Sequence, residues 1–265
     1  MPDLWPDLLA CLELTPTDPP GTFTGPNQLL EYHRIFGGQI LGQFLAAARL
    51  TCPDKSAKSL HTQFAKEGRS EEPVRYQVQC QHQGRSFATL TMTARQDAVI
   101  ATAAVTMHCA EDGPQRQAVA PMPALPGPEH RRDIGMIPWE IRADTDLDID
   151  SAGAPEYEMW MRTPPVDPAL APALAAYATD LTLIGTALRP IPGAGQRGAR
   201  TDFASAVTSH TMWFHRPFRT DRWLLLRQHS PILAHGRAFG RGDVLTEDGE
   251  LVASYAQEAM IRFRK

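Results

Sequence analysis

The feature that most constrains this chain is an internal repeat spaced by about 150 residues. Gly84-Arg85-Ser86-Phe87 recurs as Gly236-Arg237-Ala238-Phe239, an offset of 236 − 84 = 152. Ser59–Phe64 matches Thr208–Trp213 at an offset of 210 − 61 = 149, measured between their histidines. Self-similarity at a fixed spacing is typical of a duplicated structural unit. Two copies of one unit account for the 265 residues without a second kind of fold.

Each copy of the repeat places a buried helix before a set of strands. The segment 36–50 is apolar on almost every face, and a helix of that kind is buried all round. The segments 74–81, 88–94 and 99–107 alternate apolar and polar residues, which is the period of half-buried strands. The repeat places the second helix at about 180–190. A sheet curled around one helix satisfies this order. The sequence therefore predicts an α+β fold, a tandem double hotdog in which an antiparallel β-sheet wraps a long helix in each half.

Prolines are concentrated between Pro114 and Pro172, in a stretch with few apolar runs. Such a composition is typical of an extended linker. We therefore expect an N-terminal hotdog domain at residues 1–112, a Pro-rich linker at 113–170 and a C-terminal hotdog domain at 171–265.

The composition excludes several classes of function. Lys and Arg number 26 against 30 Asp and Glu, and this net charge of −4 recruits neither nucleic acid nor an anionic membrane surface. The four cysteines form no CxxC pair, which argues against a zinc site or a redox dithiol and fits a reducing compartment. We expect neither a secretory leader nor a membrane span, because the N-terminal residues lack a basic and an apolar region and no apolar run approaches ~20 residues. We expect a cytoplasmic protein with no metal, no cofactor and no nucleic-acid or membrane partner.

Three separated motifs carry a resemblance to a known family. His33–Gln43 resembles the FGGQxxGQ helix start of the acyl-CoA thioesterase II family, and Met212–Phe218 resembles its MWFHRPF segment. Residues 237–258 resemble its closing hairpin. The resemblance runs from about Gly25 to the C-terminus, with the linker poorly matched. It implies a double-hotdog fold that hydrolyses fatty acyl-CoA thioesters with water. Hotdog sheets commonly pair, so we also expect a homo-oligomer.

The resemblance also implies the catalytic groups, which in the family are an Asp on the second helix, a Ser or Thr on the next strand and a Gln on the last strand. Asp180 matches the Asp and Gln257 matches the Gln. An Asp accepts a proton from water, while a hydroxyl and an amide hold that water in place. Two plainer interpretations stay open: Asp180 as a carboxylate of the first helical turn, and Gln257 as a structural amide within a strand.

The hydroxyl position is where this chain departs from the family. Counting back from Met212, the Ser or Thr falls on Val207, which forms no side-chain hydrogen bond. Ser209 shares a strand face with Val207, whereas Thr208 needs a local bulge to reach that face. Thr208 and Ser209 are both candidates for the missing group. The alternative function is a catalytically impaired module that binds acyl-CoA. An enoyl-CoA hydratase is a lesser alternative, without an Asp/His pair at a helix start.

The candidate substrate-binding residues are Gly37, Gly38, Gln39 and His61. The two glycines allow a substrate to approach N–H groups at the helix start, which then act as an oxyanion site, or they only provide a tight helix entry. His61 and His210 hold equivalent positions in the repeat. A core or strand-pairing role is expected for both histidines, because a metal site needs more ligands than this spacing offers.

Overall fold

One continuous antiparallel sheet runs through both halves of the computed structural model, which describes residues 3–199 and 201–264. The elements of the first half are α1 (Leu4–Cys11), β1 (Thr15–Thr17), β2 (Thr22–Gly25), α2 (Gly37–Thr51), β3 (Ser56–Phe64), β4 (Val74–Gln83), β5 (Phe87–Arg95) and β6 (Val99–His108). The elements of the second half are η1 (Pro128–His130), β7 (Glu140–Arg142), β8 (Glu156–Arg162), η2 (Pro168–Leu170), α3 (Ala171–Thr179), α4 (Leu183–Leu188), η3 (Gln196–Gly198), β9 (Phe203–Phe214), β10 (Leu224–Ala234), β11 (Arg237–Thr246) and β12 (Leu251–Phe263). Residues 1, 2 and 265, at the ends of the two predicted domains, lie outside the described residues.

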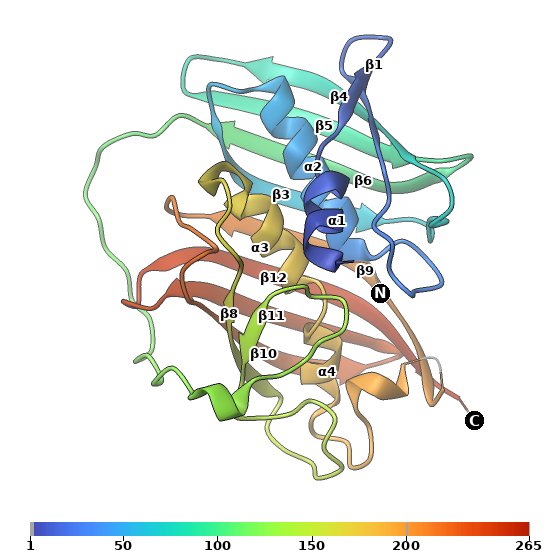
Figure 1. Ribbon diagram of the computed structural model, residues 1–265, viewed down its shortest axis with the longest axis vertical. Helices are drawn as coiled ribbons and strands as arrows, with labels where there is room; N and C mark the ends of the chain where they lie inside the picture. The colour runs from blue at the N-terminus through green and yellow to red at the C-terminus, as the bar shows by residue number, and fades with distance from the viewer. Residues whose placement is uncertain (1–2, 200, 265) are drawn as a thin grey trace.

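The two halves meet where β3 pairs with β9. The strand order is β1-β2-β4-β5-β6-β3-β9-β12-β11-β10-β8-β7, so each half contributes one block of consecutive strands. Leu60 pairs with Met212 and Thr62 with His210 across this junction. Both blocks curve around helices on the same side of the sheet (Figure 1). The predicted α+β arrangement of two helix-and-sheet units is confirmed.

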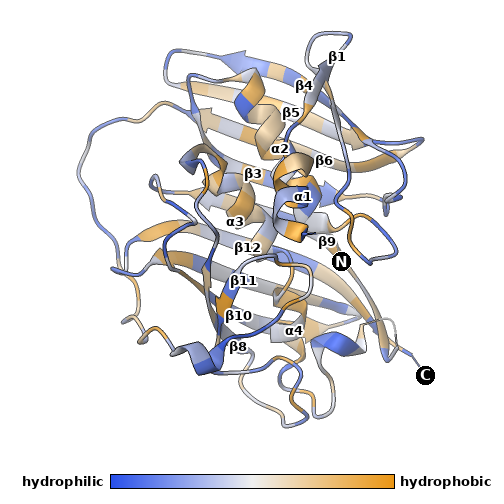
Figure 2. Cartoon of the chain, in the orientation of Figure 1, coloured by the Kyte–Doolittle hydropathy of each residue, from blue (hydrophilic) through white to orange (hydrophobic). Residues whose placement is uncertain are grey.

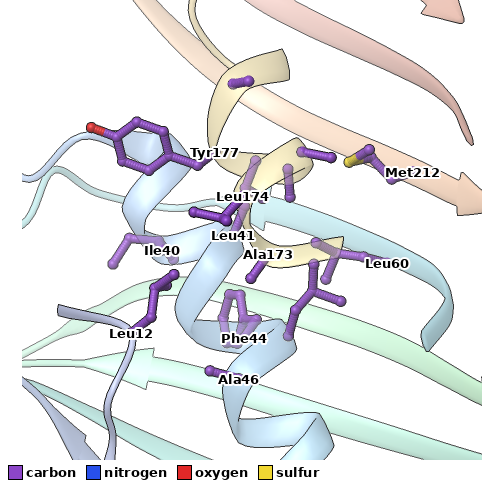
Figure 3. Close-up of a cluster of buried hydrophobic side chains, with 14 of the residues drawn as sticks. Leu12, Ile40, Leu41, Phe44, Ala46, Leu60, Ala173, Leu174, Tyr177 and Met212 are labelled. Carbon is purple, nitrogen blue, oxygen red and sulfur yellow. The ribbon is translucent and has the colours of Figure 1, made fainter. Parts of the chain in front are cut away.

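Helix α2 is the central helix of the first half. Every residue from Gly38 to Ala48 is buried. Most of them are small or aliphatic, and the two polar side chains, Gln39 and Gln43, make hydrogen bonds inside the protein. Helix α3 packs beside it, and Figure 3 shows Leu41 of α2 close to Leu174 of α3. Figure 2 shows hydrophobic residues along α2, α3 and α4. The predicted start and end of α2 are correct to within one or two residues.

The second-half helix differs from the prediction. Instead of one long helix at about 180–190, α3 ends at Thr179, and the short helix α4 packs against β8, β10, β11 and β12. Pro172 belongs to the first turn of α3, where its missing N–H removes no helical hydrogen bond. The helical segment therefore starts earlier than the repeat indicates, and Asp180 lies at the break between α3 and α4.

The stretch predicted as a linker contains two strands. β8 pairs with β10, and β7 pairs with β8, so residues 113–170 supply the outer edge of the second half of the sheet. The longest run there without helix or strand is residues 109–127. Within them, Val119, Met122 and Leu125 pack against Trp160 and its buried neighbours. The short apolar run of β8 was missed because prolines flank it, although proline is compatible with strand ends.

Among the described residues, Pro168–Leu188 is the one helical stretch with the length and composition of a membrane-crossing helix. Within it, 72% of the most apolar window is buried inside the fold, and core helices share this composition.

The close packing of α2 against α3 predicts the effect of a single methyl group. A Cβ at Gly38 would lie 2.5 Å from the backbone carbonyl oxygen of Tyr177. We expect Gly38→Ala to lower the free energy of unfolding by about 1–3 kcal/mol, although alanine is the better helix former. Gly113→Ala is the matched control, because nothing lies within 4 Å of its Cβ position. Urea denaturation measures both, and a stabilised Gly38→Ala variant would contradict this packing.

Candidate active site

The carboxylate of Asp180 lies against the first turn of α2. Its side chain is buried, with 4% of the residue exposed, and the backbone N–H of Gly38 donates a hydrogen bond to it. A Cβ at Gly37 would lie 2.6 Å from Asp180 Oδ2. Glycine at position 37 is therefore what lets the helix start come this close. The site joins a helix end from the first half to a carboxylate from the second.

Burial raises the pKa of Asp180 to about 7, against the opposing effects of the Gly38 N–H and the Arg34 guanidinium. A carboxylate whose pKa lies near neutrality combines a usable ionised fraction with a strong tendency to accept a proton. The helix break at Asp180 thus produces a group suited to general-base chemistry.

Two buried polar atoms near His210 have no hydrogen-bond partner among the protein's own described atoms. They are Asp180 Oδ1, an acceptor, and Gln257 Nε2, a donor. His210 Nδ1 lies 3.9 Å from Asp180 Oδ1 and 2.9 Å from Gln257 Oε1. Unpaired buried polar atoms are costly, so such a pair marks a place for a polar ligand. A water molecule fits it chemically, because water donates to a carboxylate and accepts from an amide.

A cleft of about 1140 Å³ passes Asp180 and is lined by both halves of the chain. Its apolar walls include, from the first half, Ile40, Phe64 and Ile100 and, from the second, Leu181, Ile184 and Met260. Its basic residues are Arg34, Lys66, Arg131, Arg132, Arg197 and Arg264. Apolar walls suit an acyl chain, and guanidinium groups suit phosphates.

Thr208 lies at a β-bulge beside the cleft. Ser209 pairs with Glu258 and Val207 with Ala259, so Thr208 is the extra residue of β9. Thr208 and Val207 both line the cleft that contains Asp180. The Thr208 hydroxyl donates to the backbone carbonyl of Glu258 at 3.0 Å. The structure brings Thr208 to the site, with its hydroxyl bonded to the adjacent strand.

Ser209 and His61 are not brought to Asp180. Both line a second, polar groove of about 720 Å³, which is formed by residues on the opposite face of the sheet. Across the junction His61 pairs with Thr211, whereas His210 pairs with Thr62. His61 and His210 therefore face opposite sides, and their equivalence in the repeat was wrong by one residue. Such a slip exchanges the two faces of a strand.

Gln39 is buried among protein partners. Its Oε1 accepts from the backbone N–H of Gln28 at 3.0 Å, and its Nε2 donates to Asn27 and Gln43 at 2.8 Å and 3.2 Å. With these bonds made, the side chain ties the loop before α2 to the helix, and Gln39 is absent from the lining of the cleft. Over residues 3–199 and 201–264, no group of three or more His, Cys, Asp or Glu side chains is placed to hold a metal ion.

A sheet that wraps helices in both halves, with a buried carboxylate between those halves, defines a double-hotdog protein. The solved structure of an acyl-CoA thioesterase II from Mycobacterium marinum matches it with a TM-score of 0.81 and 31% identity, covering 97% of this chain and 99% of that one. Family models for the acyl-CoA thioesterase N-terminal and C-terminal domains match residues 30–108 and 101–261.

Curated relatives agree with these matches over nearly the whole chain. Acyl-CoA thioesterase 2 from Haemophilus influenzae is 30% identical over 99% of both chains. Human acyl-coenzyme A thioesterase 8 is also 30% identical, over 96% of this chain and 88% of its own length. The chain belongs to the acyl-CoA thioesterase family, as the three sequence motifs indicate.

The buried carboxylate predicts how stability depends on pH. Because the pKa of Asp180 is raised from its ordinary 3.8 to about 7, the folded protein keeps a proton that the unfolded chain releases between these values. This contribution to stability is fully present below pH 3.8 and is lost as the pH rises to about 7. We expect Asp180→Asn to gain stability relative to wild type over that range. Denaturant titrations at several pH values measure the difference.

Asp97→Asn is a matched control, for which the stability difference from wild type should change with pH in the opposite direction. The Arg69 guanidinium holds the pKa of the exposed Asp97 below its usual value. Asp97→Asn should therefore lose stability relative to wild type as the pH rises, by less than Asp180→Asn gains because Asp97 is screened by solvent. A stability difference for Asp180→Asn that does not change with pH would contradict the raised pKa.

Proposed function

We propose that this protein hydrolyses fatty acyl-CoA thioesters to a free fatty acid and CoA. The observation that carries the proposal is the buried Asp180 carboxylate beside the unpartnered amide of Gln257. The cleft that passes Asp180 combines apolar walls with basic residues, which suits an acyl chain joined to a phosphorylated carrier. The relatives described above, which are named as acyl-CoA thioesterases, support the same substrate class.

The residues suggest a direct attack by water. Asp180 Oδ1 accepts a proton as the water oxygen bonds to the thioester carbonyl carbon. Gln257 Nε2 donates to that water and holds it. Gly37 lies in the cleft at the N-terminal end of α2, where the helix dipole favours negative charge on the carbonyl oxygen. When the carbon–sulfur bond breaks, the proton held by Asp180 is available to the CoA thiolate.

The alternative function, an impaired module that binds acyl-CoA, rests on Val207 alone. It gains no support from the relatives, which are named as enzymes. Thr208 lines the same cleft as Val207, which supports a hydroxyl-bearing residue on this wall.

We also propose a cytoplasmic location and a homo-oligomer without a nucleic-acid or membrane partner. Four free cysteines support a reducing compartment, and the net charge of −4 supports the absence of nucleic acid. For self-association, the supporting features are the polar groove and the exposed side chains of Trp213 and Phe239. Sedimentation velocity checks the oligomer, and a monomer at micromolar concentration would contradict it.

A free-thiol assay with acyl-CoAs of short, medium and long chains tests the reaction. Wild type should release CoA, and Asp180→Asn should lower kcat by about 10²–10⁴-fold because it removes the general base. The wild-type kcat/KM should fall below pH 7, as protonation removes the ionised Asp180. Asp112→Asn, an exposed substitution, should leave turnover unchanged. Turnover by Asp180→Asn near the wild-type value would exclude the base.

Substitution of the two hydroxyl candidates should have different effects on kcat/KM. Thr208→Val should lower kcat/KM by roughly tenfold, because it removes a hydrogen bond that fixes the bulge beside the cleft. Ser209→Ala should leave kcat/KM unchanged, because Ser209 lines the groove on the other face. Steady-state kinetics on the two single variants decides between them. A larger loss for Ser209→Ala than for Thr208→Val would reverse the assignment.

A further inference from the structure

His210 lies at the centre of the sheet, on the face that meets the helices. It pairs with Thr62 of β3 on one side and with Gln257 of β12 on the other. The residue is fully buried, and its ring stacks on that of Tyr255, with a centroid distance of 6.0 Å and an interplanar angle of 14°. These contacts fix the plane of the imidazole.

Both ring nitrogens of His210 have partners. Nδ1 lies 2.9 Å from Gln257 Oε1, and Nε2 lies 3.1 Å from Thr179 Oγ1. An amide oxygen only accepts, so in this amide orientation Nδ1 carries the proton and Nε2 is an acceptor. The Thr179 hydroxyl lies 3.1 Å from both Nε2 and the backbone carbonyl oxygen of Ala176, and its single proton bonds to one of them at a time. Burial lowers the pKa of His210 to about 4, against the effect of its bond to Gln257, so the ring is neutral near pH 7.

Direct cooperation between His210 and Asp180 does not fit this geometry. The separation of 3.9 Å between Nδ1 and Asp180 Oδ1 exceeds hydrogen-bond length. The Nδ1 proton is already donated to Gln257. His210 therefore influences the site through the amide of Gln257 and does not form a dyad with the carboxylate.

Resting on the proposed function, we propose that His210 is a positioning residue whose Nδ1–H holds the Gln257 amide with its Nε2 directed toward the water site beside Asp180. The opposite amide orientation would direct Oε1 there. The water would then face two acceptors, the amide oxygen and Asp180 Oδ1, and no N–H would hold its oxygen. The chemistry of the site thus depends on which way this amide points.

A matched pair of variants separates positioning from packing. In His210→Asn the side-chain amide nitrogen replaces Nδ1 as a donor, whereas in His210→Gln it replaces Nε2 and the donor to Gln257 is lost. We expect His210→Gln to lower kcat on the order of tenfold to a hundredfold, with KM within about twofold of wild type. His210→Asn should retain most of the wild-type kcat. Equal losses in both variants would overturn the proposal.

Gln257→Ala provides the second arm of the kinetic test. If His210 acts through the amide, adding His210→Gln to Gln257→Ala should reduce kcat by no more than about twofold. If the kcat loss of the double variant instead equals the product of the two single losses, His210 has a role that does not pass through the Gln257 amide. That result would overturn the proposal.

The protonated nitrogen of His210 is measurable in the wild-type protein without turnover. Nitrogen-15 NMR of the imidazole near pH 7 should show Nδ1 protonated and Nε2 bare. The Nε2–H form would mean that Nδ1 accepts from a reversed amide, which overturns the proposal whatever the variants do. A wild type that releases no CoA would contradict the proposed function alone, and the tautomer would still decide the role of His210.

Discussion

The structure depends on the contact between the start of α2 and the carboxylate of Asp180. A buried carboxylate is costly unless it accepts hydrogen bonds, and the Gly38 N–H supplies one while the missing side chain at Gly37 leaves the space. The same contact joins the two halves away from the sheet. It holds the carboxylate beside Gln257 and His210, so one close approach of backbone to side chain serves both folding and chemistry.

The sequence predicted those parts of the fold that depend on local patterns. Helix α2 is recognisable because it is apolar on almost every side, and β4 to β6 are recognisable because they alternate. β8 was not predicted because the strand has only seven residues, three of them charged, and lies between prolines. The helix break at Asp180 was also not predicted, because tertiary contacts with α2 and the sheet decide where the alanine-rich helix stops.

The candidate site, like the fold, was predictable from the sequence only in part. Asp180 and Gln257 came from a family resemblance, and the structure brings both near His210. The sequence alone does not reveal that the bulge at Thr208 places Val207 and Ser209 on opposite faces of β9. It also does not reveal that the repeat aligns His61 with Thr211 and not with His210. A strand with one bulge needs its partner's register before its faces can be assigned. The bulge accounts for the wrong placement of Ser209, and the one-residue slip in the repeat accounts for that of His61.

The duplicated halves have diverged in what they hold. Where β12 carries Gln257 on its inner face, β6 carries Ala103, Val105 and Met107, none of which forms a side-chain hydrogen bond to a water. A symmetric pair of separate subunits would need glycines and carboxylate together in every copy, and would build two sites. When the two halves belong to one chain, one half can supply the glycines and the other the carboxylate. One candidate site per polypeptide follows, where an unfused dimer of the same mass would hold two.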